Sequence, residues 1–331
     1  MEKQKGGIVT LGHLLIDHIT LVQTKFIENL GLERPVYHTN SAELRKILTA
    51  LQNAPAEMLK SHTKSLGGGV AICAKTLASL GIRTTLLGSV GADEDAEFLR
   101  HALDQYGILY ELGTSLKATG VFCSMQTESN AKWLVVSPEA ARDVRGMVID
   151  EKLWSNNEIL YIDGLLIDDV QWLAAIADSA VRHGLILAMD ISTVDNARYN
   201  RNIIISFAEK YCRYVFANER EYSVLKLTSQ QLASSKVYWI VKRGPKGATA
   251  IFQNRVEHAS SYSVTKIVDE TCAGDAFAGG FLYGLMMGLP VRHCLSLGNS
   301  AGKLAVMSCG SLFDQTAMRK TLMTALERLL F

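Results

Sequence analysis

The chain has 331 residues, of which 48% are hydrophobic and 20% charged, and its formal net charge is +1. This composition is typical of a globular protein with a substantial core and excludes extended disorder. A balanced charge without a long basic run argues against nucleic acid or an anionic membrane as partner. A small molecule is the better candidate ligand.

The cysteines and the N-terminus predict a cytoplasmic protein. The six cysteines lack metal-site spacing and are expected to be free thiols in a reducing compartment. Residues 1–7 lead into an apolar run without the longer apolar core of a signal peptide. The longest uncharged stretch, 276–291, falls short of the roughly 20 residues that span a bilayer, so we expect a buried helix there.

Short apolar runs alternate with amphipathic ones, a pattern typical of parallel strands joined by helices. Strands are expected at Ile8–Leu11, Thr84–Val90, Ile159–Ile162, Ile186–Asp190, Tyr214–Ala217 and Trp239–Lys242. Helices are expected at Val70–Leu80, Asp95–Tyr106, Asp168–His183, Ala276–Met287, Val291–Met307 and Thr316–Leu330. The order predicts an α/β fold, a doubly wound and mainly parallel sheet sandwiched by helices.

Two stretches break the alternation, 18–39 and 109–136, and their Thr, Val and Tyr content favours strands. We expect them to form a small β lid over a core made of residues 1–17, 40–108 and 137–331. The chain shows no internal repeat, so lid and core are expected to be interwoven.

The segment Asp269-Glu270-Thr271-Cys272-Ala273-Gly274-Asp275 is the strongest functional signal. It joins a strand-like run, Tyr262 to Val268, to a helix of small and apolar residues from Ala276. The first turn of that helix would offer unpaired N–H groups to an anion, and the helix dipole adds about half a positive charge. Asp275 would then be placed to take a proton from an attacking hydroxyl. An ordinary connection with a capping Asp is the alternative.

This segment resembles the D-T-x-G-A-G-D motif of the ribokinase-like (PfkB-type) carbohydrate kinase family, with Glu270 in place of Thr and Cys272 in place of Gly or Ala. The resemblance implies that Asp275 is the catalytic base and that Cys272, Ala273 and Gly274 supply the anion hole. It also makes Asp269 and Thr271 candidate ligands of a monovalent cation such as K⁺. We further expect Cys272, at a helix N-terminus, to have a lowered thiol pKa and to alkylate fastest.

Motifs in the first half resemble the acceptor side of the same family. Asp17, which ends Gly12-His13-Leu14-Leu15-Ile16-Asp17, is similar to the aspartate that binds sugar hydroxyls, although alone it could be a turn residue. Gly68 and Gly69 are similar to the glycine-rich substrate loop. The long connection between these motifs resembles adenosine kinases. Ile72 stands where an Asn usually binds a sugar hydroxyl, which predicts that adenosine is a poor substrate.

Motifs in the second half resemble the nucleotide side. Asn218 and Glu221 match the family's N-x-x-E element, which implies support of Mg²⁺ through water; a helix start is the alternative. Gly244, Lys246 and Gly247 resemble a nucleotide-binding turn, although a bare glycine turn has low specificity. Asn299 takes a position that lines the adenine side in the family.

Together these features predict an ATP- and Mg²⁺-dependent kinase for a primary hydroxyl of a sugar or nucleoside, acting as a monomer or as a homodimer through the lid. One alternative is a sugar- or nucleoside-binding protein of the same fold with weakened catalysis. An oxidoreductase is disfavoured because no G-x-G-x-x-G follows the first strand.

Overall fold

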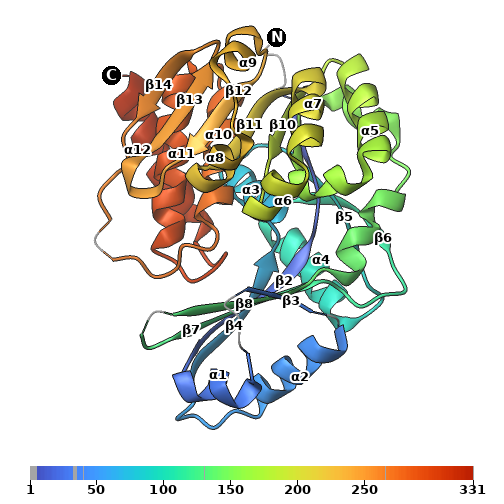
Figure 1. Ribbon diagram of the computed structural model, residues 1–331, viewed down its shortest axis with the longest axis vertical. Coiled ribbons are helices and arrows are strands. Elements are labelled where there is room, and N and C mark those ends of the chain that lie inside the picture. Colours follow the sequence, from blue (N-terminus) through green and yellow to red (C-terminus); the bar gives the residue numbers. More distant parts are fainter. Residues whose placement is uncertain (1–5, 33–35, 40, 130, 265, 331) are drawn as a thin grey trace.

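The residues that the computed structural model describes, 6–32, 36–39, 41–129, 131–264 and 266–330, are organised around two β-sheets (Figure 1). The larger sheet has the strand order β14-β13-β12-β11-β10-β9-β1-β5-β6. All pairings from β12 to β6 are parallel, and β13 and β14 continue the sheet as antiparallel strands. Its strands are β1 (Gly7–Leu11), β5 (Thr84–Val90), β6 (Leu109–Thr114), β9 (Asn157–Asp163), β10 (Ile186–Asp190), β11 (Cys212–Asn218), β12 (Tyr238–Lys242), β13 (Ala248–Phe252) and β14 (Arg255–Ala259).

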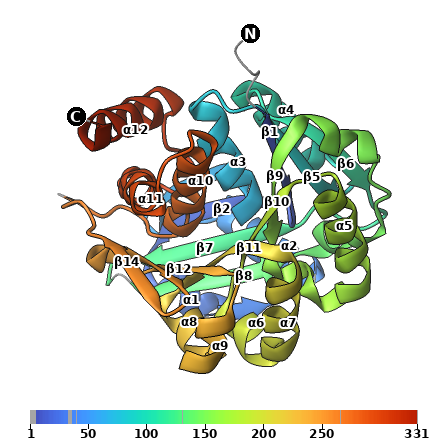
Figure 2. The same cartoon turned by 90° about the horizontal axis from the view of Figure 1, so that it is seen from above.

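Helices cover both faces of this sheet (Figure 2). Side chains alternate along each strand, so Ile8 enters the core on one face while Val9 enters the core on the other. One face carries α3 (Gly69–Ser79), α4 (Glu94–Tyr106), α10 (Ala273–Met286), α11 (Val291–Val306) and α12 (Gln315–Leu330). The other carries α5 (Val170–Arg182), α6 (Val194–Tyr199), α7 (Arg201–Tyr211), α8 (Glu219–Leu225) and α9 (Ser229–Ser234). The predicted fold class is confirmed.

The smaller sheet has the order β3-β8-β7-β2-β4 and lies beside the large sheet in Figure 1. Helices α1 and α2 cover its face away from the large sheet. These elements are β2 (Leu15–Val22), α1 (Thr24–Leu30), β3 (Val36–His38), α2 (Ser41–Gln52), β4 (Leu59–Gly67), β7 (Val121–Thr127) and β8 (Lys132–Ser137). We call this unit the lid sheet.

The boundaries of the lid differ from the sequence prediction at several points. Strand β4 and helix α2 belong to the lid sheet, although residues 40–108 were assigned to the core. Strand β6 extends the large sheet, although residues from 109 onward were assigned to the lid. Residues 60–65 of β4 are all polar, so this strand lacks the apolar alternation that would reveal it, and its outer half is largely exposed.

The predicted strand at Tyr262–Val268 is wrong for the described residues of that segment, which form no regular structure between β14 and α10. The N–H groups of Val268 and Asp269 donate to the carbonyl of Val306, at 2.7 and 3.2 Å. The segment is therefore fastened to the end of α11, and no strand of either sheet pairs with it. None of the described helices is both long and apolar enough to cross a membrane.

The order of connections creates a switch point in the large sheet. The chain enters at β1, moves to β5 and β6 on one side, and then continues from β9 to β12 on the other. The connections that leave β1 and β9 therefore run in opposite directions from the carboxyl ends of neighbouring strands. In open α/β sheets, ligands bind in the crevice at such a point.

Candidate active site

A cavity of about 1020 Å³ lies at this switch point. It is lined by residues that follow β1, β9, β10, β11 and β12, by the turn before α3, by the first turn of α10 and by α11. Of the residues singled out from the sequence, it contains Gly68, Gly69, Asn218, Glu221, Gly244, Gly247, Thr271, Ala273, Gly274, Asp275 and Asn299. Asp17, Ile72, Lys246, Asp269 and Cys272 are not among the residues that line it.

The first turn of α10 has free N–H groups suited to an anion, and we call it the anion-binding turn. The helix begins at Ala273, and the N–H of Ala276 is the first in this turn to bond back to the Cys272 carbonyl. The N–H groups of Gly274 and Asp275 precede it and have no carbonyl of their own helix to bond. The Lys242 ammonium adds charge here, because a Cβ placed on Gly274 would lie 3.2 Å from its Nζ. A helix N-terminus and an ammonium therefore converge on one point.

Asp275 lies in this turn and faces the glycine turn before α3. A Cβ on Gly69 would lie 2.7 Å from the Asp275 Oδ1, so any larger residue at this position would displace the Asp275 carboxyl group. Burial raises the pKa of Asp275 to about 7, opposed by Lys242 and assisted by the charges of Asp190, Asp163 and Glu221. A carboxyl group with a pKa near neutrality can accept a proton at physiological pH.

Asp17 lies on β2 of the lid sheet rather than at the end of the first strand or in a turn, opposite Ser65 of β4. It is only 3% exposed, and among the described residues no hydrogen bond reaches its carboxyl group. The Ser65 hydroxyl is likewise buried without a partner among these residues. Burial, with the charges of Asp275 and Asp269, raises the pKa of Asp17 well above its usual value. A buried carboxyl without partners is a costly arrangement that a polar ligand would relieve.

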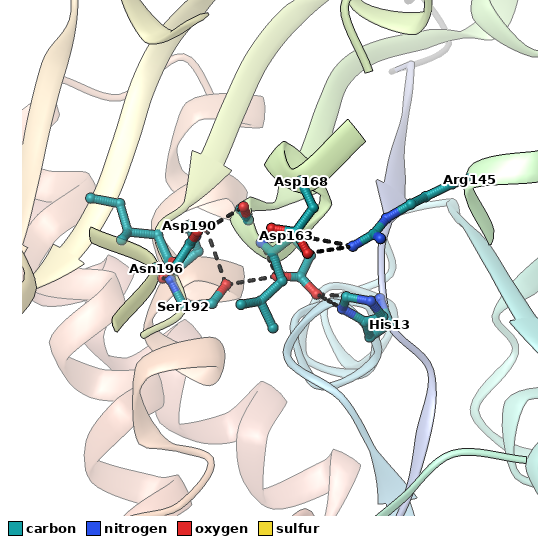
Figure 3. Close-up of polar contacts among 10 residues, drawn as sticks. His13, Arg145, Asp163, Asp168, Asp190, Ser192 and Asn196 are labelled. Carbon is teal, nitrogen blue, oxygen red and sulfur yellow. Dashed lines mark hydrogen bonds and ion pairs between the residues drawn. The ribbon is translucent and has the colours of Figure 1, made fainter. Parts of the chain in front are cut away.

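A polar cluster that was not predicted lines the cavity beside the anion-binding turn (Figure 3). The Nδ1 atom of His13 lies 2.7 Å from Asp163 Oδ2, and the Ser192 hydroxyl donates to Asp163 Oδ1 at 2.7 Å. Burial would raise the pKa of Asp163, but the His13 contact and hydrogen bonds from Leu165 and Ser192 lower it below the usual value. The Nε2 atom of His13 is buried and has no partner among the described residues.

Asp190 and Lys242 form the second half of this cluster. The Lys242 Nζ lies 2.5 Å from Asp190 Oδ2, and both side chains are largely buried. Burial would lower the pKa of Lys242, but the charges of Asp190, Glu221 and Asp275 raise it above the usual value. Lys242 is therefore a charged ammonium at the anion-binding turn.

Asn218 and Glu221 form a capping box at the start of α8. The Asn218 N–H and side-chain amide donate to the two Glu221 oxygens at 2.8 and 2.6 Å, and Asn218 Oδ1 accepts from the Glu221 N–H. The interpretation of N-x-x-E as a helix start thus describes the local structure. Both side chains also line the cavity, and burial raises the pKa of Glu221, opposed by Lys242.

The residues present fit a magnesium ion held together with phosphates. Among the described residues, no group of three or more His, Cys, Asp or Glu side chains is arranged to hold a metal by itself. Mg²⁺ usually takes only one or two carboxylates and completes its shell with water and substrate phosphates. Asp190 and Glu221 both line the cavity beside the anion-binding turn and supply two carboxylates.

Two of the three residues expected in a nucleotide-binding turn line the cavity. Gly244 and Gly247 line it and both have positive φ angles, 53° and 89°. Lys246 instead points outward, where its exposed ammonium lies 3.5 Å from Glu219. The Asn299 amide donates to the carbonyls of Ala259 and Ser260 at 2.9 and 3.1 Å. Asn299 therefore fixes the end of β14 at the edge of the cavity.

The structure contradicts the expected thiolate at Cys272 and gives no support to the role expected of Ile72. Cys272 is only 2% exposed and packs in the core, and burial raises the pKa of its thiol well above the usual value, so the helix terminus does not produce a thiolate. Ile72 is 3% exposed and belongs to the same core cluster. It is not among the residues that line the cavity, so it provides no basis for the expected effect on adenosine.

Asp269 lies outside the cavity and connects three segments. Its Oδ1 accepts from the Thr271 N–H at 3.1 Å, from the Thr271 hydroxyl at 2.6 Å and from Lys132 Nζ at 2.9 Å. Its Oδ2 accepts from the Gly310 N–H at 3.1 Å. Burial would raise the pKa of Asp269, but the Thr271 and Lys132 contacts lower it, so the group is ionised.

Three of the residues missed by sequence reasoning had a detectable signal. Asp163 and Asp190 are the last residues of two strands that were predicted correctly, β9 and β10. Carboxyl ends of parallel strands at a switch point are where open α/β sheets place ligand-binding side chains. Lys242 likewise ends β12. His13 gave no separate signal, because its importance depends on contact with a residue 150 positions away.

This combination of a doubly wound sheet, a glycine turn and an acid in a helix N-terminal turn is that of ribokinase-fold sugar and nucleoside kinases. Residues 43–317 match the pfkB family carbohydrate kinase, and the chain belongs to that family. Among curated proteins, it is 23% identical over 316 residues to a 5-dehydro-2-deoxygluconokinase of Bacillus thuringiensis, covering 83% of this chain and 90% of the relative. A relative of the same name from Clostridium beijerinckii is 25% identical over 291 residues, covering 77% of this chain and 82% of that protein.

Solved structures show the same fold. The adenosine kinase from Sinorhizobium meliloti superposes with a TM-score of 0.82 at 21% identity, covering 96% of this chain and 99% of that structure. A probable sugar kinase from Rhizobium etli superposes with a TM-score of 0.85 at 19% identity, covering 99% of this chain and 100% of that structure. Curated relatives and solved structures therefore carry names with different acceptors.

Proposed function

We propose that this protein is an ATP-dependent kinase that phosphorylates a primary hydroxyl of a sugar, sugar acid or nucleoside. The observation that carries the proposal is the position of Asp275. Its carboxyl group has a pKa raised to about 7, lies in the anion-binding turn and faces the glycine turn at the switch point of the sheet. A base and an anion site thus share one turn.

Each part of the site has a chemical role in this proposal. Asp275 accepts the proton of the acceptor hydroxyl, whose oxygen then bonds to the γ-phosphorus while the bond to the β-phosphate oxygen breaks. The N–H groups of Gly274 and Asp275, with the Lys242 ammonium, stabilise the charge on the transferring group. Mg²⁺, when bound beside Asp190 and Glu221, would neutralise charge on the nucleotide phosphates.

The acceptor is proposed to lie between the lid sheet and the glycine turn. Asp17 does not line the cavity, but it lies on β2 close enough to Asp275 for their charges to interact, and its partner-free carboxyl group suits the hydroxyls of a sugar ring. Gly68, with φ of 91°, places backbone close to this region. The lid sheet would exclude water that could otherwise compete for the phosphoryl group.

The test is ATP consumption across a panel of sugars, sugar acids and nucleosides. The panel includes 5-dehydro-2-deoxygluconate and adenosine, the acceptors that the names of the relatives indicate. Phosphorus NMR of the product should show a phosphate ester on a primary carbon. If no member of the panel supports turnover while ATP still binds, the alternative of a binding protein with weakened catalysis is favoured.

A further inference from the structure

The Asp269 carboxylate accepts from four donors of this chain, three on Oδ1 and one on Oδ2. An ionised carboxylate offers about four acceptor sites, and four donors lie within 3.1 Å of its two oxygens. Its side chain is only 5% exposed. A monovalent cation such as K⁺, which the family resemblance suggests at Asp269 and Thr271, would have to displace Lys132 or a Thr271 donor from Oδ1. These residues therefore do not fit that cation.

One of the four donors is itself a cation. Lys132 begins β8 of the lid sheet, lies 137 positions from Asp269 in sequence, and its side chain is 31% exposed. Its ammonium carries the same single charge as K⁺ and is a compact, strongly hydrated group with three donors. The chain itself thus brings a positive charge to this carboxylate.

Asp269 also connects Lys132 to the segment that leads into the anion-binding turn. It accepts two hydrogen bonds from Thr271, the residue before Cys272, and through Gly310 it holds the connection between α11 and α12. The anion-binding turn follows at once, with Ala273 as the first residue of α10. The Lys132–Asp269 ion pair therefore links the lid sheet to the segment that precedes the phosphate site.

We propose that the Lys132 ammonium takes the place of a monovalent cation at Asp269, so that the enzyme needs no K⁺ and its phosphate site is completed only when the lid sheet is in place. Lys132 is a positioning residue, because it acts through Asp269 and touches no reacting atom. The proposal rests on the proposed kinase function. It goes beyond that function because it predicts how activity depends on the monovalent cation: the wild-type protein should be indifferent to it, and Lys132→Ala should not.

The experiment compares the wild-type protein with Lys132→Ala, Lys132→Arg and a control, Lys60→Ala. Lys60 also lies in the lid sheet, and its exposed ammonium is 3.4 Å from Glu128. Turnover of the best acceptor and binding of a non-hydrolysable ATP analogue are measured in K⁺, Na⁺ and tetramethylammonium chloride at equal ionic strength. Binding of the analogue, measured by calorimetry, tests the phosphate site even if no acceptor is turned over.

The wild-type protein and Lys60→Ala should change less than about twofold among the three salts. Lys132→Ala should lose about tenfold to hundredfold in kcat/KM, the range for a hydrogen-bonded charge, and should bind the analogue more weakly. Potassium should restore part of that loss, and Lys132→Arg should retain most activity in every salt. Circular dichroism and thermal unfolding check that each variant is folded.

Stimulation of the wild-type protein several-fold by K⁺ would overturn the proposal while leaving the kinase function intact. So would a Lys132→Ala variant that matches Lys60→Ala in every salt. If Lys132→Ala does not fold, the salt series on the wild-type protein and on Lys132→Arg still tests whether the enzyme needs K⁺. Absence of turnover with every acceptor would instead count against the kinase function, and analogue binding would still report on the ion.

Discussion

Replacement of Asp275 by Asn tests the proposed base most directly, because the two side chains have nearly the same size. The variant should bind the ATP analogue nearly as well as the wild-type protein. Its turnover should fall by about 10²–10⁴-fold, the usual contribution of a positioned general base. Near-normal turnover would remove Asp275 from the mechanism.

The pH dependence gives an independent check on the same group. With a pKa raised to about 7, Asp275 should be half protonated near pH 7. The wild-type kcat/KM should fall about tenfold for each pH unit below that value, because only the charged carboxylate accepts a proton. A profile that stays flat between pH 5 and pH 8 would refute the assignment.

The free energy of unfolding should change with pH in the opposite direction to kcat/KM. Between the ordinary pKa of 3.8 and about 7, the native protein holds a proton on Asp275 that the unfolded chain has released. Wild-type stability therefore decreases as pH rises through this window, whereas the Asp275→Asn variant carries no such penalty. In urea unfolding, the advantage of the variant should grow by up to about 3 kcal/mol between pH 5 and pH 8. An advantage that shrinks over this range would contradict the raised pKa.

Three further variants or reactions follow from the site and the core. Lys242→Met should lower kcat by about 10²-fold through loss of charge at the anion-binding turn, whereas the exposed Lys246→Met should behave like the wild-type protein; equal kinetics in both would exclude Lys242. Iodoacetamide should modify Cys309 first, because the other five cysteines, Cys272 included, are buried, and peptide mass spectrometry would reveal a different order. Ile72→Asn should destabilise the protein by about 3 kcal/mol, since it places an amide in the core, and unchanged urea unfolding with better adenosine use would restore the original interpretation of Ile72.

Features that depend on residues close together in the sequence could be predicted. The buried strands and the helix after Asp275 follow from apolar periodicity and small residues, which act locally. Tyr262–Val268 has strand-like alternation, but whether a strand forms depends on a partner, and this segment bonds to the end of α11. The motifs around Cys272 and Ile72 could be located from the sequence. Whether each side chain points into the cavity or into the core is decided by packing against distant elements, and both point into the core.

The lid sheet is assembled from separate stretches that leave the large sheet and return to it. Strands β2 to β4 are inserted between β1 and β5, and β7 and β8 between β6 and β9, whereas the anion-binding turn lies beyond residue 270. Insertions or exchanges within these stretches could therefore remodel the surface that meets the acceptor without altering the chain that carries Asp275. Such modularity offers a physical reason why relatives that share this fold over most of their length carry the names of both sugar-acid and nucleoside kinases.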